Sequence, residues 1–230
     1  LNSPTGSATD DWTGPGGYNQ PNTQNPTIGG ATVAMSGVYT VTVTNAGGCS
    51  ATATTTVTVN PLPTPTANNT GPYCAGATIV LNSPTGSATD DRTGSAGYNQ
   101  QNTQNPTIPG STVAMSGVYT VTVTNGFGCS ATATTTVTVN PLPTPTANNT
   151  GAYCVGQTIQ LNSPTGSATD DWTGPGGYVQ NNMQNPTIPG ATPAMAGVYT
   201  VTVTTGAGCS ATATTTVVIN PAGVAVAGNT

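Results

Sequence analysis

The chain of 230 residues has no lysine, no histidine and no glutamate, and its only basic residue is Arg92. Nucleic-acid binding requires a cationic surface, so the composition excludes that class of function. General acid–base catalysis at neutral pH relies on groups such as His or Lys, which are absent. No nucleophile–base pair can be assembled from the remaining residues. We therefore expect a protein that is not an enzyme.

Charged residues make up 3% of the chain, against roughly 25% in ordinary soluble domains. Disorder usually goes with high net charge and few β-branched residues, whereas this sequence is rich in Val and Thr. It contains no run of about 18 apolar residues and no basic segment followed by an apolar one, so neither a membrane span nor a signal peptide is predicted. The sequence begins and ends inside a repeat, and we interpret it as part of something longer.

The dominant feature is a repeat with a period of 80 residues, in which LNSPTGSATDD, GVYTVTVT and GCSATATTTV recur. Self-similarity of this kind predicts a string of small modules rather than one globule. The Pro- and Asn-rich segment NPLPTPTANNTG marks the boundary. We predict a truncated module at 1–60, complete modules at 61–140 and 141–220, and the start of a further module or linker at 221–230.

The strand signals are clearest in the middle module. Val and Thr alternate with period 2 over 117–124 and almost as cleanly over 130–139, and the glycines of 125–128 favour a turn between them. Residues 77–82 form another expected strand, 89–93 a weak one, and 104–108 a short one interrupted by Pro106. No segment has helical periodicity. The predicted class is all-β, with two-sheet sandwiches of about seven strands arranged as an extended rod.

Several motifs occur in a fixed order: Cys-x-Gly-x-x-Ile-x-Leu at 74–81, Trp-Thr-Gly-Pro-x-Gly-Tyr at 12–18 and 172–178, then Gln-Asn-Pro-Thr-Ile and Gly-Cys-Ser-Ala-Thr. This series resembles the immunoglobulin-like or PKD-like repeats of large secreted bacterial surface proteins, which are abundant in Bacteroidota adhesins. Ser116-Gly-Val-Tyr119 also matches the tyrosine corner that opens strand F of immunoglobulin sandwiches. The resemblance implies that 104–108 is strand E and that the two long strands are F and G.

Five cysteines occupy two phases of the repeat: Cys74 and Cys154, then Cys49, Cys129 and Cys209. Regular half-cystines indicate an extracellular, oxidising setting. Spacing offers the intramodule bridges Cys74–Cys129 and Cys154–Cys209, which we favour, with Cys49 pairing upstream. The strand order of immunoglobulin folds conflicts with these bridges, because it places the two phases at opposite ends of a module. The alternative is a latch between modules that joins Cys74 to Cys209.

A contact surface is predicted around the Trp-Thr-Gly motif. In the middle module an arginine stands in place of the tryptophan, and a fully buried guanidinium would leave an unpaired charge. We therefore expect this face to be partly exposed. It is either an interface or binding surface, or a surface on which the tryptophan simply packs against Pro15 and Tyr18. Its residues are Asp10, Trp12, Tyr18, Asp90, Arg92, Tyr98, Asp170, Trp172 and Tyr178.

Each module carries a pair of adjacent aspartates, the second ones being Asp11, Asp91 and Asp171. Calcium needs six to eight oxygens, and neighbouring strand residues point to opposite faces, so we expect solvated acids and no cofactor.

The sequence favours a structural segment of an extracellular or cell-surface filament or adhesin, whose partners are neighbouring repeats or copies of itself. The alternative is a multivalent module that binds glycan or protein through the Trp/Tyr/Asp surface of each repeat.

Overall fold

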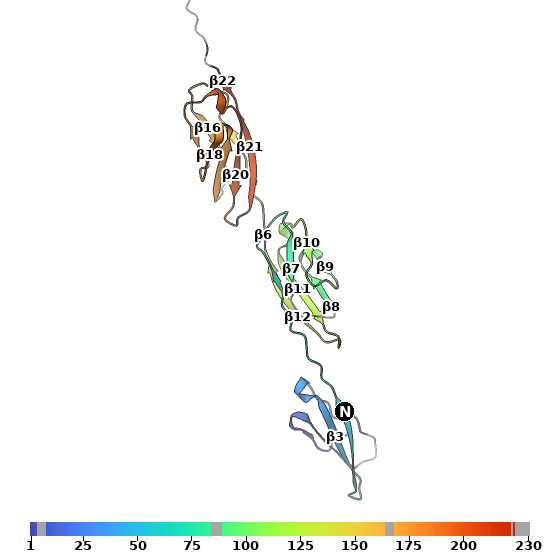
Figure 1. The fold of residues 1–230 in the computed structure, drawn as a ribbon. Coiled ribbons are helices and arrows are strands. Elements are labelled where there is room, and N and C mark those ends of the chain that lie inside the picture. The colour runs from blue at the N-terminus through green and yellow to red at the C-terminus, as the bar shows by residue number, and fades with distance from the viewer. Residues whose placement is uncertain (4–7, 84–88, 164–167, 222, 224–230) are drawn as a thin grey trace, which may run out of the picture.

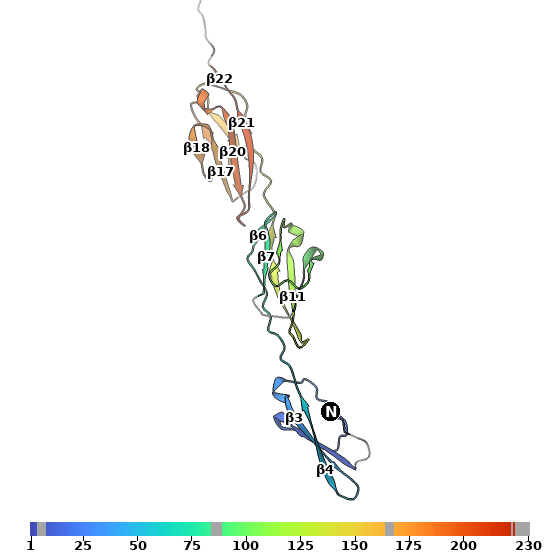
Figure 2. The ribbon, with the colours of Figure 1, turned by 45° about the vertical axis from the view of Figure 1, so that its right-hand side comes forward.

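The computed structural model of the protein describes residues 1–3, 8–83, 89–163, 168–221 and 223. The three copies of the repeat follow one another end to end as an extended string (Figure 1), and the view turned by 45° keeps the same arrangement (Figure 2). We describe them as the first copy (1–60), the second copy (61–140) and the third copy (141–220). Among the described residues, no helix is long and apolar enough to cross a membrane.

The second and third copies contain the same series of elements. The second has β5 (Asn68–Asn69), β6 (Tyr73–Cys74), β7 (Ile79–Asn82), β8 (Thr89–Thr93), η3 (Ser95–Gly97), β9 (Asn99–Gln100), β10 (Thr107–Ile108), η4 (Val113–Met115), β11 (Gly117–Thr124), β12 (Ser130–Val137) and β13 (Val139–Asn140). The third has β14 (Asn148–Asn149), β15 (Tyr153–Cys154), β16 (Ile159–Asn162), β17 (Thr169–Gly174), η5 (Pro175–Gly177), β18 (Tyr178–Gln180), β19 (Thr187–Ile188), η6 (Pro193–Met195), β20 (Gly197–Thr204), β21 (Ser210–Val217) and β22 (Ile219–Asn220).

The first copy contains the later part of this series. Its described elements are β1 (Thr9–Gly14), η1 (Pro15–Gly17), β2 (Tyr18–Gln20), η2 (Val33–Met35), β3 (Gly37–Thr44) and β4 (Ser50–Val57). Its sheet has the order β2-β1-β3-β4, which matches β9-β8-β11-β12 in the second copy and β18-β17-β20-β21 in the third.

Each complete copy has two facing antiparallel layers. In the second copy the larger sheet is β12-β11-β8-β9 and the smaller is β10-β7-β5, while β6 runs parallel to β13 at the edge. The long hairpin β11–β12 pairs over eight residues on each strand, as the Val/Thr alternation predicts. Strand β12 ends at Val137, and the chain then turns to pair with β6, so the single strand expected over 130–139 is divided in two.

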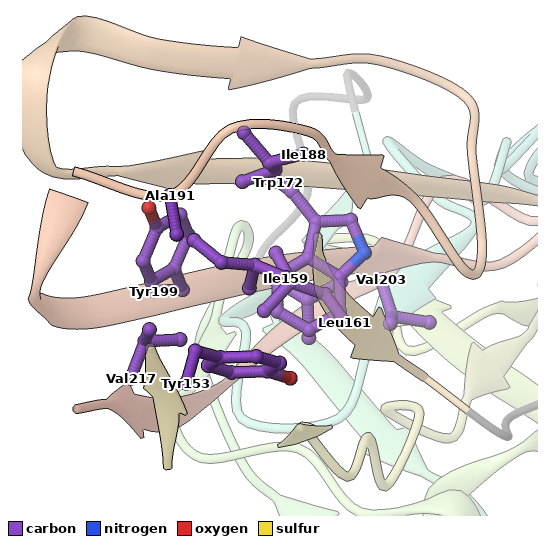
Figure 3. Close-up of a cluster of buried hydrophobic side chains, with 10 residues drawn as sticks. Tyr153, Ile159, Leu161, Trp172, Ile188, Ala191, Tyr199, Val203 and Val217 are labelled. Carbon is purple, nitrogen blue, oxygen red and sulfur yellow. The ribbon is translucent and has the colours of Figure 1, made fainter. Parts of the chain in front are cut away.

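The core lies between the layers and comes from the alternating apolar positions of both. In the third copy it contains Ile159 and Leu161 from β16, Trp172 from β17, and Tyr199, Val201 and Val203 from β20, closed by Tyr153 and Val217 (Figure 3). Val121 and Val123 of β11 are buried in the same way, whereas the intervening threonines are half-buried. Burial of this apolar face stabilises the fold by roughly 25 cal/mol per Å² of apolar surface.

The predicted tyrosine corner is present in every copy. The Tyr119 hydroxyl donates to the Met115 carbonyl at 3.0 Å, and the equivalent bonds are Tyr39–Met35 and Tyr199–Met195. The tyrosine ring also explains the glycine that ends β8. A Cβ at Gly94 would overlap the ring of Tyr119, although the backbone there is ordinary extended chain. Glycine is therefore required by packing at this position.

Candidate functional site

A disulfide joins the second copy to the third. Cys74 lies at the end of β6, and Cys209 lies in the turn between β20 and β21. Their Cα atoms are 5.5 Å apart, within the usual range for a disulfide, although 135 positions separate them in sequence. The polypeptide crosses the same junction through residues 141–147, so a second covalent connection runs beside the chain itself. We call this disulfide the latch.

The Cys74 half of the latch is held by strand pairing. In the parallel pair of β6 and β13, Tyr73 is opposite Val139 and Cys74 is opposite Asn140. The Cys74 carbonyl accepts the Ser111 hydroxyl at 3.1 Å and the Ala77 N–H at 3.0 Å. These bonds fix the backbone that carries the sulfur at one end of the sandwich.

Tyr73 fixes the neighbouring backbone. Its buried hydroxyl donates to the Val80 carbonyl at 3.1 Å and accepts the N–H groups of Val80 and Thr70. Tyr153 repeats these bonds in the third copy, with Gln160 and Thr150. Sequence reasoning did not single out these tyrosines. The signal was available, because each immediately precedes a first-phase cysteine.

The Cys209 half is a tight turn. The Thr205 N–H donates to the Cys209 carbonyl at 2.9 Å, and the Cys209 N–H donates to the Thr205 hydroxyl at 3.2 Å. Gly208 supplies the positive φ of 80° that the turn needs, which strongly favours glycine. Cys209 is fully buried, whereas the equivalent Cys49 is exposed and Cys129 half-buried.

The favoured intramodule bridges, Cys74–Cys129 and Cys154–Cys209, are wrong. Cys74 is bonded to Cys209 instead, and Cys129 and Cys154 are free thiols, as is Cys49. The reason is the strand order: β6 and the β11–β12 turn lie at opposite ends of one sandwich, while the end of one copy faces the turn of the next (Figure 1). The alternative of a latch between modules is confirmed.

The junction between the first and second copies has a polar contact in the corresponding turn. The Asn125 amide donates to the Pro61 carbonyl of the connector at 2.8 Å. The same side chain caps its own turn, because its oxygen accepts the N–H groups of Phe127 and Cys129. Asn125 therefore ties the connector to the turn that carries Cys129. The Asn-Gly dipeptide indicates the turn, but nothing in the sequence indicates the bond to Pro61.

The expected exposed contact surface is also wrong. Trp12 and Trp172 are 2% and 0% exposed, and Arg92 is 1% exposed. Asp10, Asp90 and Asp170 are buried as well, and the half-buried Tyr18, Tyr98 and Tyr178 have buried hydroxyls without a hydrogen-bond partner. These residues belong to the interior of each copy and leave little surface for a ligand.

A shared carbonyl explains how an arginine is accepted in the tryptophan position. The indole nitrogens of Trp12 and Trp172 donate to the carbonyls of Gln24 and Gln184 at 3.4 and 3.3 Å. A terminal nitrogen of Arg92 donates to the equivalent Gln104 carbonyl. Burial lowers the pKa of Arg92, and the charge of Asp90 partly opposes that shift. The Arg92 Nε has no hydrogen-bond partner, so the substitution is tolerated rather than optimal.

The two aspartates of each pair have different structural roles. The first points inward, where Asp10 accepts the Ser3 hydroxyl at 2.9 Å and Asp170 accepts that of Ser163 at 3.0 Å. The second caps a turn: Asp11 accepts the N–H of Asn22, which has a positive φ of 53°. Within the described residues, no three Cys, His, Asp or Glu side chains gather where they could hold a metal.

The first copy has an apolar groove of about 360 Å³ where the complete copies have core. Its lining includes Leu1, Ile28, Met35, Tyr39 and Val57. In the second copy Tyr73 and Ile79 pack against Tyr119 and Val137, which correspond to Tyr39 and Val57.

The strand order, the parallel pair at the edge and the tyrosine corner together decide the fold class. The copies are immunoglobulin-like. No protein-family model matches the chain, and no curated protein matches it significantly.

Solved structures of low similarity include three domains of the bacteriophage RB49 outer capsid protein Hoc (15% identity, TM-score 0.43, covering 97% of this chain and 91% of that one). Others are a piece of a 1.5-MDa bacterial ice-binding adhesin (20% identity, TM-score 0.38, covering 92% and 86%) and murine CEACAM1b (14% identity, TM-score 0.37, covering 68% and 100%). At these values the likeness carries no argument about function.

Proposed function

We propose that the chain is a non-enzymatic structural segment of an extracellular or cell-surface filament or adhesin, in which tandem immunoglobulin-like copies provide length. The observation that carries this proposal is the latch. A disulfide between successive copies restrains the angle between them, which a connector alone does less well. A protein whose function is to hold a long, straight shape needs that restraint.

Two further features support the proposal. The connector contains Pro141, Pro143 and Pro145, which fix φ and favour extended backbone, so adjacent copies do not easily fold back on each other. A structural disulfide persists in an oxidising compartment, which favours a location outside the cell. The partners are then neighbouring repeats or other copies of the chain.

The alternative, a module that binds glycan or protein through its Trp/Tyr/Asp surface, is disfavoured. Trp12 and Asp10 are buried in the core, and their equivalents in the other copies are buried as well. A ligand would reach these side chains only by opening the sandwich. Multivalency does not compensate for a surface that is inaccessible in each copy.

Small-angle scattering of the oxidised Cys49→Ser variant, which keeps Cys74 and Cys209 and cannot link to a second chain through Cys49, tests the proposal. Each copy spans about 30 Å, so three in line give a rod of about 100 Å with a radius of gyration near 30 Å. A compact globule of this length has a radius of gyration of about 17 Å, and a value close to it would contradict the proposal. Cys209→Ser removes the latch and should lower the radius of gyration and broaden the distribution of distances. Cys129→Ser in the same background, at the equivalent position without a disulfide, is the matched control and should leave both unchanged.

A further inference from the structure

Two of the free thiols lie on the opposite ends of the string and have the form of the two latch halves. Cys154 is in β15, which pairs with β22 at the outer end of the third copy (Figure 1). Cys49 directly precedes β4, in the hairpin turn at the outer end of the first copy (Figure 2). Both cysteines are exposed.

The Cys154 end reproduces the Cys74 half of the latch. Tyr153 is opposite Ile219 and Cys154 is opposite Asn220 in a parallel pair, as Tyr73 and Cys74 are in β6. The Cys154 carbonyl accepts the N–H of Gln157 at 3.1 Å, just as the Cys74 carbonyl accepts that of Ala77. The backbone that carries the sulfur is therefore already in the bonded arrangement.

The Cys49 end reproduces the Cys209 half. The Asn45 N–H donates to the Cys49 carbonyl at 3.0 Å, and the Gly48 N–H donates to the Asn45 carbonyl at 3.0 Å. The turn around Cys209 has the same two bonds, and Gly48 and Gly208 share a φ of 80°. The positions in the repeat agree too. Cys154 lies one repeat of 80 residues after Cys74, and Cys49 lies two such repeats before Cys209.

We propose that the Cys154 end of the third copy and the Cys49 turn of the first copy are complementary latch halves, so that two 230-residue segments join end to end through a Cys154–Cys49 disulfide equivalent to Cys74–Cys209. This inference rests on the proposed structural function and adds the assembly contact. Cys129 is not a partner in this scheme. It is half-buried, and Asn125 ties its turn to the connector from the first copy.

The chemistry is a pair of thiol–disulfide exchanges with a small-molecule disulfide such as oxidised glutathione. The Cys154 thiolate attacks one sulfur of the oxidant and releases one glutathione thiolate. The Cys49 thiolate of the second copy then attacks the Cys154 sulfur of the mixed disulfide and releases the other. Two protein thiols are oxidised and one oxidant disulfide is reduced to two thiols, so electrons and protons balance.

The test uses the 230-residue protein oxidised with a glutathione buffer and analysed by non-reducing electrophoresis and peptide mapping. We expect a ladder of multiples of 22.5 kDa that reducing agent abolishes, with linked peptides containing Cys154 and Cys49. Cys129→Ser should keep the ladder, while Cys154→Ser or Cys49→Ser should remove it. A ladder that survives either of the last two variants would overturn the inference.

A mixing experiment separates a specific latch from random oxidation. In a Cys129→Ser background, a chain with only Cys154 free is mixed with a chain with only Cys49 free. The mixture should give dimers and nothing longer, and neither chain alone should dimerise appreciably. Dimers formed equally well by each chain alone would refute the specific pairing. If no ladder forms although Cys74–Cys209 is oxidised and scattering shows a rod, this inference is wrong while the proposed structural function stands.

Discussion

The buried arginine of the second copy offers a stability test with a defined sign. Replacing Arg92 by Trp should stabilise that copy, because the first and third copies already hold an indole in the same environment. The indole N–H would donate to the Gln104 carbonyl, as those of Trp12 and Trp172 do to their equivalents. The side chain would then complete a core that in the third copy includes the tryptophan.

The expected increase in the free energy of unfolding follows from the hydration that the guanidinium loses on burial. Arg92 is 1% exposed and its Nε has no hydrogen-bond partner. An unsatisfied buried polar atom costs about 1–3 kcal/mol, and replacing a buried ionic group by a well-packed apolar one stabilises by up to about 4 kcal/mol. We expect Arg92→Trp to raise the free energy of unfolding of the second copy by about 1–4 kcal/mol. In a domain of this size each kcal/mol raises the unfolding midpoint by about 4–8 °C.

Differential scanning calorimetry of the intact oxidised chain measures the effect, and two further variants separate its causes. Arg92→Met removes the charge without adding a ring and should give a smaller gain. Trp172→Arg places the same guanidinium beside Asp170 in the third copy and should lower the midpoint of that copy. If Arg92→Trp lowers the midpoint, or if Trp172→Arg has no effect, the indole and the guanidinium do not occupy equivalent sites and the reasoning is refuted.

Four other predictions concern packing, the groove, pH and calcium. Gly94→Ala should destabilise the second copy by about 1–3 kcal/mol, because the new Cβ overlaps the Tyr119 ring. The control is Gly126→Ala, where a Cβ would meet no atom within 4 Å, and this variant should change the denaturation midpoint little. The first copy should unfold before the third, because its buried core is smaller and its groove is open. Trp12 fluorescence, measured in a Trp172→Phe variant, should therefore change at a lower denaturant concentration than Trp172 fluorescence measured in a Trp12→Phe variant. The opposite order would contradict this prediction. Burial raises the pKa of four tyrosine hydroxyls above 10.0, so the folded state disfavours their ionisation: Tyr98, Tyr119, Tyr178 and Tyr199. The free energy of unfolding should be constant below about pH 9 and fall as the pH rises past the tyrosine pKa of the unfolded chain, near 10. Urea denaturation midpoints measured across about pH 7–11 would reveal this fall. Chelation with EDTA should leave the thermal midpoint unchanged, since the inward aspartates accept serine hydroxyls and the outward ones cap turns; a shift of many degrees that added calcium reverses would disprove this.

The long strands and the tyrosine corner were predictable because their signals are local. Period-2 alternation identified β11 and most of β12, and Ser116-Gly-Val-Tyr119 identified the corner with its hydrogen bond to Met115. The two-residue strands β5 and β6 were not predicted. They are too short for periodicity, and one lies within the Pro- and Asn-rich boundary segment while the other follows it directly.

The latch and the Trp position mark the limits of reasoning from spacing and charge. Spacing favoured a bridge within the module, whereas the strand order implied by the immunoglobulin resemblance placed the cysteines at opposite ends, and the structure follows the strand order. The rule that a buried guanidinium is intolerable also failed. It overlooked a backbone carbonyl at Gln104, far along the chain, which accepts a hydrogen bond from either side chain. No local sequence pattern predicts a hydrogen bond between a side chain and a backbone carbonyl of another segment.

The latch also decides how a pulling force passes through the string. Tension that arrives at Cys74 crosses the disulfide to Cys209, at a sequence separation of 135, and bypasses residues 75–208, so most of the second and third copies carry no load. Reducing the bond would add up to about 450–490 Å of extensible chain, at 3.3–3.6 Å per residue. Where the latch recurs, each load-bearing stretch of chain is only the final strand of a copy, its connector and the first short strands of the next copy, as from Cys49 to Cys74. In the proposed filament, the sandwiches would then act as spacers that keep these short stretches aligned, and the filament would resist stretching without relying on the stability of any single copy.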